Sequence, residues 1–134
     1  MKSNKEILVI EDHESIRMLL AKFLSKDYSV TTKKDGLEGL AHLSQGNIPD
    51  LIMLDMSLPN INGLDFLSNI RSSGFFSHLP ILVVSGEESN RVIKKCHSLG
   101  VSGYITKPFN PIDLKTKIKA ILSDEGQKRV QFAK

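Results

Sequence analysis

Five short segments typical of β-strands alternate with five longer segments in which apolar residues recur every three or four positions. The clearest strand is Leu51–Leu54, where four consecutive apolar residues lie between Asp50 and Asp55. A continuous apolar run of this kind predicts a strand buried on both faces, as in a parallel sheet. Strict alternation of strands with helices also predicts right-handed crossover connections, with helices covering both faces of that sheet.

Four further segments complete the predicted sheet. They cover Ile7–Ile10, Asp27–Thr32, Ile81–Val84 and Gly103–Thr106. The first and third of these are again apolar runs, whereas the second shows the alternation of a strand that is buried on one side. Five strand–helix units are too few for an eight-stranded barrel. The sequence therefore predicts an α/β fold with an open, doubly wound parallel sheet.

Capping and turn residues mark where some of the predicted helices begin. Asp35 begins the second helix in a pattern that resembles a capping box. Asn110 followed by Pro111 is a strong start signal for the fifth helix, because proline is well suited to the first helical position. After the third helix, we expect Phe75 and Phe76 to anchor the connecting loop in the core.

Composition indicates one globular domain. Of 134 residues, 40% are hydrophobic and 25% are charged, which is ordinary for a soluble domain. The net charge of +3 comes from scattered lysines, so we expect no direct nucleic-acid binding. The sequence shows no membrane-spanning run and no signal peptide, and Cys96 is its single cysteine, so a cytoplasmic location without membrane contact is expected. The domain is expected over residues 5–123, followed by a flexible tail or linker stub over 124–134.

Polar side chains follow four of the predicted strands. They are Glu11 and Asp12, Asp55, Ser85, and Lys107. Asp55 taken alone also fits a simple turn at the end of a strand, but the carboxyl ends of parallel strands meet at one edge, where ligands bind in open α/β sheets. Three clustered carboxylates require a cation, and hard oxygen ligands favour Mg²⁺. A nucleophilic carboxylate, a metal, an ammonium group and a hydroxyl group together suit a phosphoryl group.

These residues resemble the motifs of the receiver domain of two-component response regulators. The matching positions are Glu11-Asp12, Asp55 before Leu58-Pro59 and Gly63, Ser85-Gly86, and Lys107-Pro108-Phe109. The resemblance covers the chain from about Lys5 to Ser123. It implies a flavodoxin-like (CheY-like) sheet of five parallel strands in the order 2-1-3-4-5, with helices on both faces.

The resemblance also implies a chemical role for each matching residue. Asp55 would accept a phosphoryl group from a phosphohistidine on a histidine kinase or a phosphotransfer protein. Mg²⁺ would be held by Glu11, Asp12, Asp55 and the backbone carbonyl of Ser57. Lys107 would pair first with Asp55 and then with the phosphoryl group. Such a domain assists only its own phosphorylation and dephosphorylation, so we do not expect an enzyme that acts on other substrates.

Two further residues are implied to act as a switch. Ser85 would donate a hydrogen bond to the phosphoryl group, and Tyr104 matches the family's switch aromatic. The peptide bond between Lys107 and Pro108 is expected to be cis. A downstream protein target or output domain would bind the face formed by the fourth helix, the fifth strand and the fifth helix.

Three other functions agree less well with these residues. An aspartyl-phosphate phosphatase of the haloacid dehalogenase type needs a second acid two residues after the nucleophile, where this chain has Ser57. A flavin- or nucleotide-binding module needs a glycine-rich or hydroxyl-rich first loop, whereas this loop is acidic. A receiver-like interaction module that works without phosphorylation is disfavoured by the complete set of site residues. The four histidines lack metal-ligand spacing and are expected at the surface, including His13, which follows the acidic pair.

Overall fold

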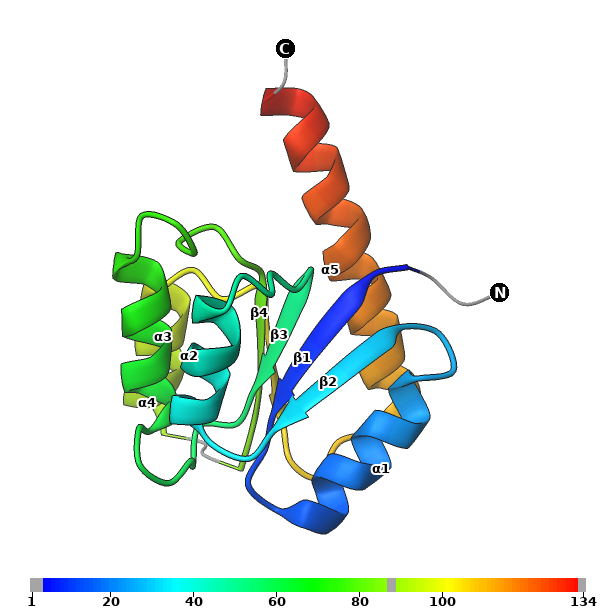
Figure 1. Cartoon of the computed structure of the whole chain (residues 1–134), viewed down its shortest axis with the longest axis vertical. Coiled ribbons are helices and arrows are strands. Elements are labelled where there is room, and N and C mark those ends of the chain that lie inside the picture. The colour runs from blue at the N-terminus through cyan, green and yellow to red at the C-terminus, as the bar shows by residue number, and fades with distance from the viewer. Residues whose placement is uncertain (1–3, 87–88, 133–134) are drawn as a thin grey trace.

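The computed structural model describes residues 4–86 and 89–132, with side chains described up to Ser123. Five parallel strands form one sheet in the order β2-β1-β3-β4-β5, which confirms the predicted fold and strand order. The strands are β1 (Glu6–Ile10), β2 (Ser29–Lys33), β3 (Leu51–Leu54), β4 (Ile81–Ser85) and β5 (Gly103–Thr106). All of the strands run in the same direction, so their carboxyl ends lie at one edge of the sheet (Figure 1).

Helices cover both faces of this sheet. They are α1 (Glu14–Leu24), α2 (Gly36–Ser44), α3 (Gly63–Ser72), α4 (Asn90–Ser98) and α5 (Pro111–Phe132). In Figure 1, α1 and α5 lie on one side of the sheet and α2, α3 and α4 on the other. Each side has its own hydrophobic cluster, one built on α1 and α5 and the other on the remaining helices.

The central strand β3 explains why the sequence contains an uninterrupted apolar run. Ile52 and Leu54 point into the cluster under α2, α3 and α4, whereas Leu51 and Met53 point into the cluster under α1 and α5. All four side chains are at most 2% exposed. Burying a side chain of this size contributes about 1.5–3 kcal/mol, so β3 links the two cores and fixes the position of the residue that follows it.

Side-chain caps fix several helix starts as the sequence predicts. Asp35 accepts a hydrogen bond from the Glu38 amide at 2.8 Å, which confirms it as the N-cap of α2. The Glu38 carboxylate, however, accepts from the Lys34 amide at 3.3 Å, one residue before the position a capping box uses. Asn110 accepts from the Ile112 amide at 2.8 Å and caps α5.

Phe75 does not anchor the loop after α3 as expected. Its side chain is 69% exposed, while Phe76 packs against the core. The Ser73 hydroxyl accepts hydrogen bonds from the amides of both phenylalanines at 3.2 Å, and this tight turn allows only one of the two rings to face inward. The two rings meet edge to face at 5.0 Å.

The last helix continues beyond the point where the sequence analysis ends the domain. Helix α5 runs to Phe132, and its final part projects past the sheet (Figure 1). The segment after Ser123 lacks apolar residues at core spacing, but it contains glutamate, glutamine, lysine and arginine, which favour helix, and no proline. The expected tail is therefore helical up to Phe132, and the domain boundary at residue 123 stays a prediction.

Arg71, in the last turn of α3, joins two loops at the edge of the sheet opposite the carboxyl ends. Its guanidinium group donates to the carbonyl oxygens of Leu99 and Gly100 at 2.6 and 3.0 Å, just after α4. It also donates to the carbonyl oxygens of Ser77 and Leu79 at 2.9 and 2.8 Å, before β4. These groups include carbonyls that a helix end leaves without intrahelical partners, so Arg71 fastens the end of α4 to the end of α3.

Gly63→Ala should destabilise the domain because α3 begins in close contact with the loop after β3. An added Cβ at Gly63 would lie 2.5 Å from Met56 Cα and 2.8 Å from the Asp55 carbonyl oxygen. We expect the free energy of unfolding to fall by about 1–3 kcal/mol, as for other overpacked sites, measured by urea denaturation. Gly74→Ala is the control, because its Cβ would meet nothing within 4 Å; equal losses in both variants would contradict this account.

Candidate functional site

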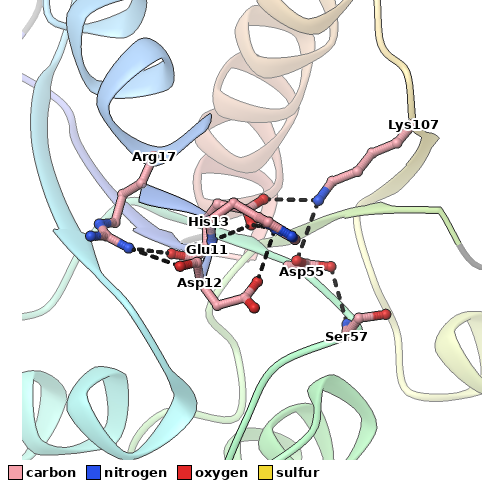
Figure 2. Close-up of polar contacts among 7 residues, drawn as sticks. All are labelled: Glu11, Asp12, His13, Arg17, Asp55, Ser57 and Lys107. Atoms are coloured by element: carbon pink, nitrogen blue, oxygen red, sulfur yellow. Dashed lines mark hydrogen bonds and ion pairs between the residues drawn. The ribbon is translucent and has the colours of Figure 1, made fainter. Parts of the chain in front are cut away.

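Two buried carboxylates lie side by side at the carboxyl ends of adjacent strands. Glu11 follows β1 and Asp55 follows β3, and each residue is 3% exposed. The Asp55 amide donates to the Ile10 carbonyl at 3.2 Å, so strand pairing continues up to the acid. With Asp12 and His13, these residues offer ligand atoms that all lie within 4.8 Å of one another. The acidic residues expected at this edge therefore form one compact cluster (Figure 2).

Lys107 directly follows the edge strand β5 and reaches this cluster from there. Its Nζ lies 2.9 Å from Glu11 Oε1 and 3.3 Å from Asp55 Oδ2 (Figure 2). The Lys107 amide donates to the Ser85 carbonyl at 2.8 Å, which holds the end of β5 against the end of β4. The peptide bond between Lys107 and Pro108 is cis. One ammonium group thus bridges two carboxylates from different strands.

The two buried acids differ in how readily they release a proton. Burial raises the pKa of Glu11, but hydrogen bonds from Lys107 and His13 outweigh burial and leave this pKa below its ordinary value. Burial also raises the pKa of Asp55, and the Ser57 amide and Lys107 do not fully offset burial and the Glu11 charge. Lys107 lies closer to Glu11, and Glu11 is also hydrogen-bonded to His13, which together account for the difference. Asp55 is therefore the acid that gains more from a further cation.

Lys107 stays charged in this setting. Burial lowers its pKa, but the hydrogen bond to Glu11 and the Asp55 charge outweigh burial and raise the pKa overall. Because the ammonium group is only partly buried and faces two acids, it supplies a fixed positive charge at neutral pH.

His13 and Arg17 belong to the site although the sequence analysis did not assign them to it. The His13 ring is 61% exposed, as a surface histidine should be, yet Nδ1 lies 3.0 Å from Glu11 Oε2 and 3.2 Å from Asp12 Oδ1. The hydrogen bond with Glu11 is the main reason why the pKa of His13 is raised. Arg17 Nη1 donates to the backbone carbonyls of Glu11 and Asp12 at 3.0 and 3.3 Å, and so holds the acidic loop against α1 (Figure 2).

The oxygen atoms of this cluster fit a hard divalent cation. Asp12 Oδ1 is buried, and none of the described residues offers it a hydrogen bond of acceptable geometry, although His13 Nδ1 is 3.2 Å away. A buried carboxylate oxygen without a donor is costly unless a cation satisfies it. Asp55 Oδ1 already accepts from the Ser57 amide at 3.1 Å, which orients that carboxylate. Clustered carboxylates of this kind suit Mg²⁺ better than softer metals.

Ser85 and Tyr104 lie on β4 and β5, which pair with each other next to Lys107. Ser85 ends β4 with its side chain fully buried at 0% exposure, and it pairs in register with Thr106, the residue before Lys107. Tyr104 lies two residues before Thr106 on β5 and pairs with Val83; it is half-buried and packs against the hydrophobic cluster under α2, α3 and α4. Both residues therefore belong to the two strands that position Lys107.

Sequence comparison identifies the family. Residues 7–119 match the family model of the response regulator receiver domain. The chain belongs to this family. It is a phosphoacceptor receiver domain of two-component signalling.

Relatives of this receiver include small proteins and parts of larger ones. It is 33% identical to the chemotaxis protein CheY-3 of Vibrio cholerae over 124 residues, which cover 90% of this chain and 94% of the relative. It is 38% identical to the regulatory protein PhoP of Bacillus subtilis over 120 residues, covering 89% of this chain but 49% of PhoP. Histidine kinase P4 of Formosa agariphila matches at 31% over 134 residues, which are 98% of this chain and 10% of that protein. The chain thus spans about half of one relative and a tenth of another.

Solved structures agree with this fold. A CheY-like receiver domain from Methanospirillum hungatei superposes with a TM-score of 0.87 at 28% identity, covering 94% of this chain and 99% of the other. Among the helices that the structure describes in this receiver, none has the length and apolar character needed to cross a membrane.

Asp55→Asn should stabilise the receiver at neutral pH when Mg²⁺ is removed by a chelator. The folded-state pKa of Asp55 is raised above its ordinary value of 3.8. In the pH range just above that value, the folded chain therefore binds more protons at Asp55 than the unfolded chain does. Stability then falls as the pH rises through this range. An asparagine at position 55 does not titrate and so does not lose stability in this way, and it leaves Lys107 paired with Glu11. The stability advantage of the variant should therefore grow as the pH rises above about 4.

Urea unfolding at several pH values measures this difference. Asp113→Asn is the matched control, since it removes an exposed acid from the start of α5. If the difference in the free energy of unfolding between the variant and the natural chain is the same at every pH, the surroundings of Asp55 do not raise its pKa.

Proposed function

We propose that Asp55 is the residue of this receiver that accepts the phosphoryl group, with Mg²⁺ held by Glu11, Asp12, Asp55 and the backbone carbonyl of Ser57. The observation that carries this proposal is the Lys107 ammonium group placed between the Glu11 and Asp55 carboxylates at 2.9 and 3.3 Å. An acid that is buried, has a raised pKa and faces a fixed cation is suited to covalent chemistry on a dianionic group.

Phosphoryl transfer onto Asp55 is a displacement at phosphorus. An oxygen of Asp55 forms a bond to phosphorus as the bond between phosphorus and the donor's imidazole nitrogen breaks, and the electron pair of that bond stays on the imidazole. Mg²⁺ supplies neutralisation of the phosphoryl oxygens when it is bound. The Ser57 amide, 3.1 Å from Asp55 Oδ1, fixes the carboxylate so that one oxygen faces the donor.

Lys107 and Ser85 then stabilise the product. The charge of Lys107 compensates either the carboxylate before transfer or a phosphoryl oxygen after it. Ser85 donates its hydroxyl hydrogen to a phosphoryl oxygen, and because this side chain is short, the end of β4 moves toward Asp55. Tyr104 turns inward to fill the space that this movement opens, since an unfilled void loses packing contacts.

This switch acts on the surface formed by α4, β5 and α5. A cavity of about 530 Å³ between β5 and α5 has Tyr104 in its wall, which supports a binding role for this face. We propose a histidine kinase or a phosphotransfer protein as donor and a protein or output domain as downstream partner. We further propose a cytoplasmic signalling domain that contacts neither nucleic acid nor membrane directly and catalyses no reaction on other substrates.

Phosphorylation from a small donor tests the acceptor. Incubation with acetyl phosphate and Mg²⁺ should add one base-labile phosphoryl group, as an acyl phosphate requires, and Asp55→Asn should remove it. Intact-mass measurement before and after mild base reads out the modification. Asp12→Ala or a chelator should also abolish labelling, because each removes the metal from the site.

The matched control is Asp113→Asn, which alters an exposed acid in the first turn of α5 that is not one of the site residues and should label normally. Labelling that persists in Asp55→Asn, or that maps to a serine, would contradict the assignment of Asp55 as the phosphoacceptor. A natural chain that is never labelled would favour the interaction module that works without phosphorylation.

Ser85→Ala should separate phosphorylation from its readout. Asp55 keeps Lys107 and the metal ligands in this variant, so labelling should remain, but the hydroxyl that draws the end of β4 toward the phosphoryl group is lost. Nuclear magnetic resonance with beryllofluoride as phosphoryl mimic should show shifts at Tyr104 and α4 in the natural chain and much smaller ones in the variant. A full response in Ser85→Ala would rule out this route of transmission.

A further inference from the structure

A groove runs between α3 and α4, which lie next to each other on one side of the sheet (Figure 1). Its wider part has a cavity volume of about 560 Å³ and a narrower part has about 300 Å³. Leu64 of α3 and Val92 of α4 line both parts, so the two parts adjoin each other along the groove. The narrower part ends at Ser57, two residues after Asp55.

The groove combines an apolar floor with a cationic wall. Leu64 and Val92 are partly buried against the core and still line the groove, so they present apolar surface to its interior. Arg91, Lys94 and Lys95 line the wider part from α4, and all three are exposed. Their spacing of three and four residues puts them on one face of the helix.

These three cations have no anionic partner within the described part of the chain. None of Arg91, Lys94 and Lys95 takes part in an ion pair there, and the described helix α4 contains no acidic residue. Like charges at this spacing destabilise a helix by a few tenths of a kcal/mol per pair. Their arrangement on one side of an apolar channel is complementary to a ligand that is acidic on one face and apolar on another.

We propose that the groove between α3 and α4 binds an acidic amphipathic helix of a partner protein. Leucine-like side chains would enter between Leu64 and Val92, and carboxylates on the flank of the helix would meet Arg91, Lys94 and Lys95. This is the helix-in-groove mode of peptide recognition. The surface differs from the one formed by α4, β5 and α5, because it uses the side of α4 that faces α3.

A protein helix fits this groove better than a polyanion does. Asp65 lines the narrower part of the groove and is exposed, so a nucleic acid or an anionic membrane laid along the channel would meet a negative charge. Nucleic-acid surfaces also gain from aromatic side chains that stack on bases, and the residues lining the two parts of this groove include none.

The probe is a synthetic peptide of about 15 residues, long enough for four helical turns, with a leucine stripe on one face and glutamates elsewhere. Titration into the isotope-labelled full chain should shift the amide resonances of Leu64, Val92 and Lys94. The double variant Lys94→Glu/Lys95→Glu should weaken binding by about tenfold or more, equivalent to about 1.4 kcal/mol. These substitutions are on exposed positions, so the fold should persist.

Lys117→Glu/Lys119→Glu on α5 is the matched control, with the same change of charge at exposed positions outside the groove. It should alter affinity by less than about twofold, within the scatter of surface charge changes. A peptide of the same composition without the leucine stripe should bind at least tenfold more weakly.

The proposal fails if the shifts map to Tyr104 and Lys117 in place of the groove, or if the two charge variants weaken binding equally. It also fails if the unstriped peptide binds as well as the striped one. Binding of a short DNA duplex or of vesicles with anionic lipid at Lys94, in place of the peptide, would assign the cationic wall to a different class of ligand. Because the probe is used without phosphorylation, these outcomes do not depend on Asp55 being the acceptor.

Discussion

The contact between one ammonium group and two buried carboxylates is the interaction around which this receiver is arranged. Glu11 and Asp55 come from neighbouring strands and would repel each other if they were left alone. Lys107 crosses from the last strand to both of them. Burying such charges costs free energy unless each one is paired. The strand order brings the ends of β1, β3, β4 and β5 to one edge, and this allows the charges of the cluster to pair.

The same arrangement explains why the site is buried but still open to chemistry. Apolar residues of β1 and β3 fill both cores up to the last strand position, and the acids begin where those cores end. Asp55 is thereby desolvated on the side of the sheet, while Ser57, two residues later, is exposed. A carboxylate at such a boundary is desolvated by the sheet on one side and adjoins exposed chain on the other, which is what the proposed acceptor role of Asp55 requires.

Much of this could be predicted from the sequence, because the determining signals are local. The apolar run of β3, the acids that follow β1 and β3, and the capping residues Asp35 and Asn110 each act within a few positions of the chain. Parallel topology then brings the strand ends together without any knowledge of distances. The resemblance to receivers supplied the strand order, which local signals alone do not determine.

What the sequence could not show depends on side-chain direction and on turns. His13 and Arg17 contact the acidic loop because α1 begins immediately after it, and the rotamers that achieve this are not encoded in a spacing rule. Phe75 and Phe76 are adjacent and equally apolar, yet the Ser73 turn makes only one of them part of the core. The extent of α5 was missed because helix propensity, unlike burial, leaves no apolar stripe.

Arg71 gives the domain a fixed point far from the acids. Its four carbonyl contacts attach the end of α4 to α3 and to the loop before β4. A helix that is held at its C-terminal end tilts when a force acts near its N-terminal end. Under the proposed switch, movement of the end of β4 would therefore displace α4 least near Gly100 and most near Asn90, so the groove between α3 and α4 would change most beside Ser57. The angle between these two helices, more than their separation, would then describe how this side of the molecule responds.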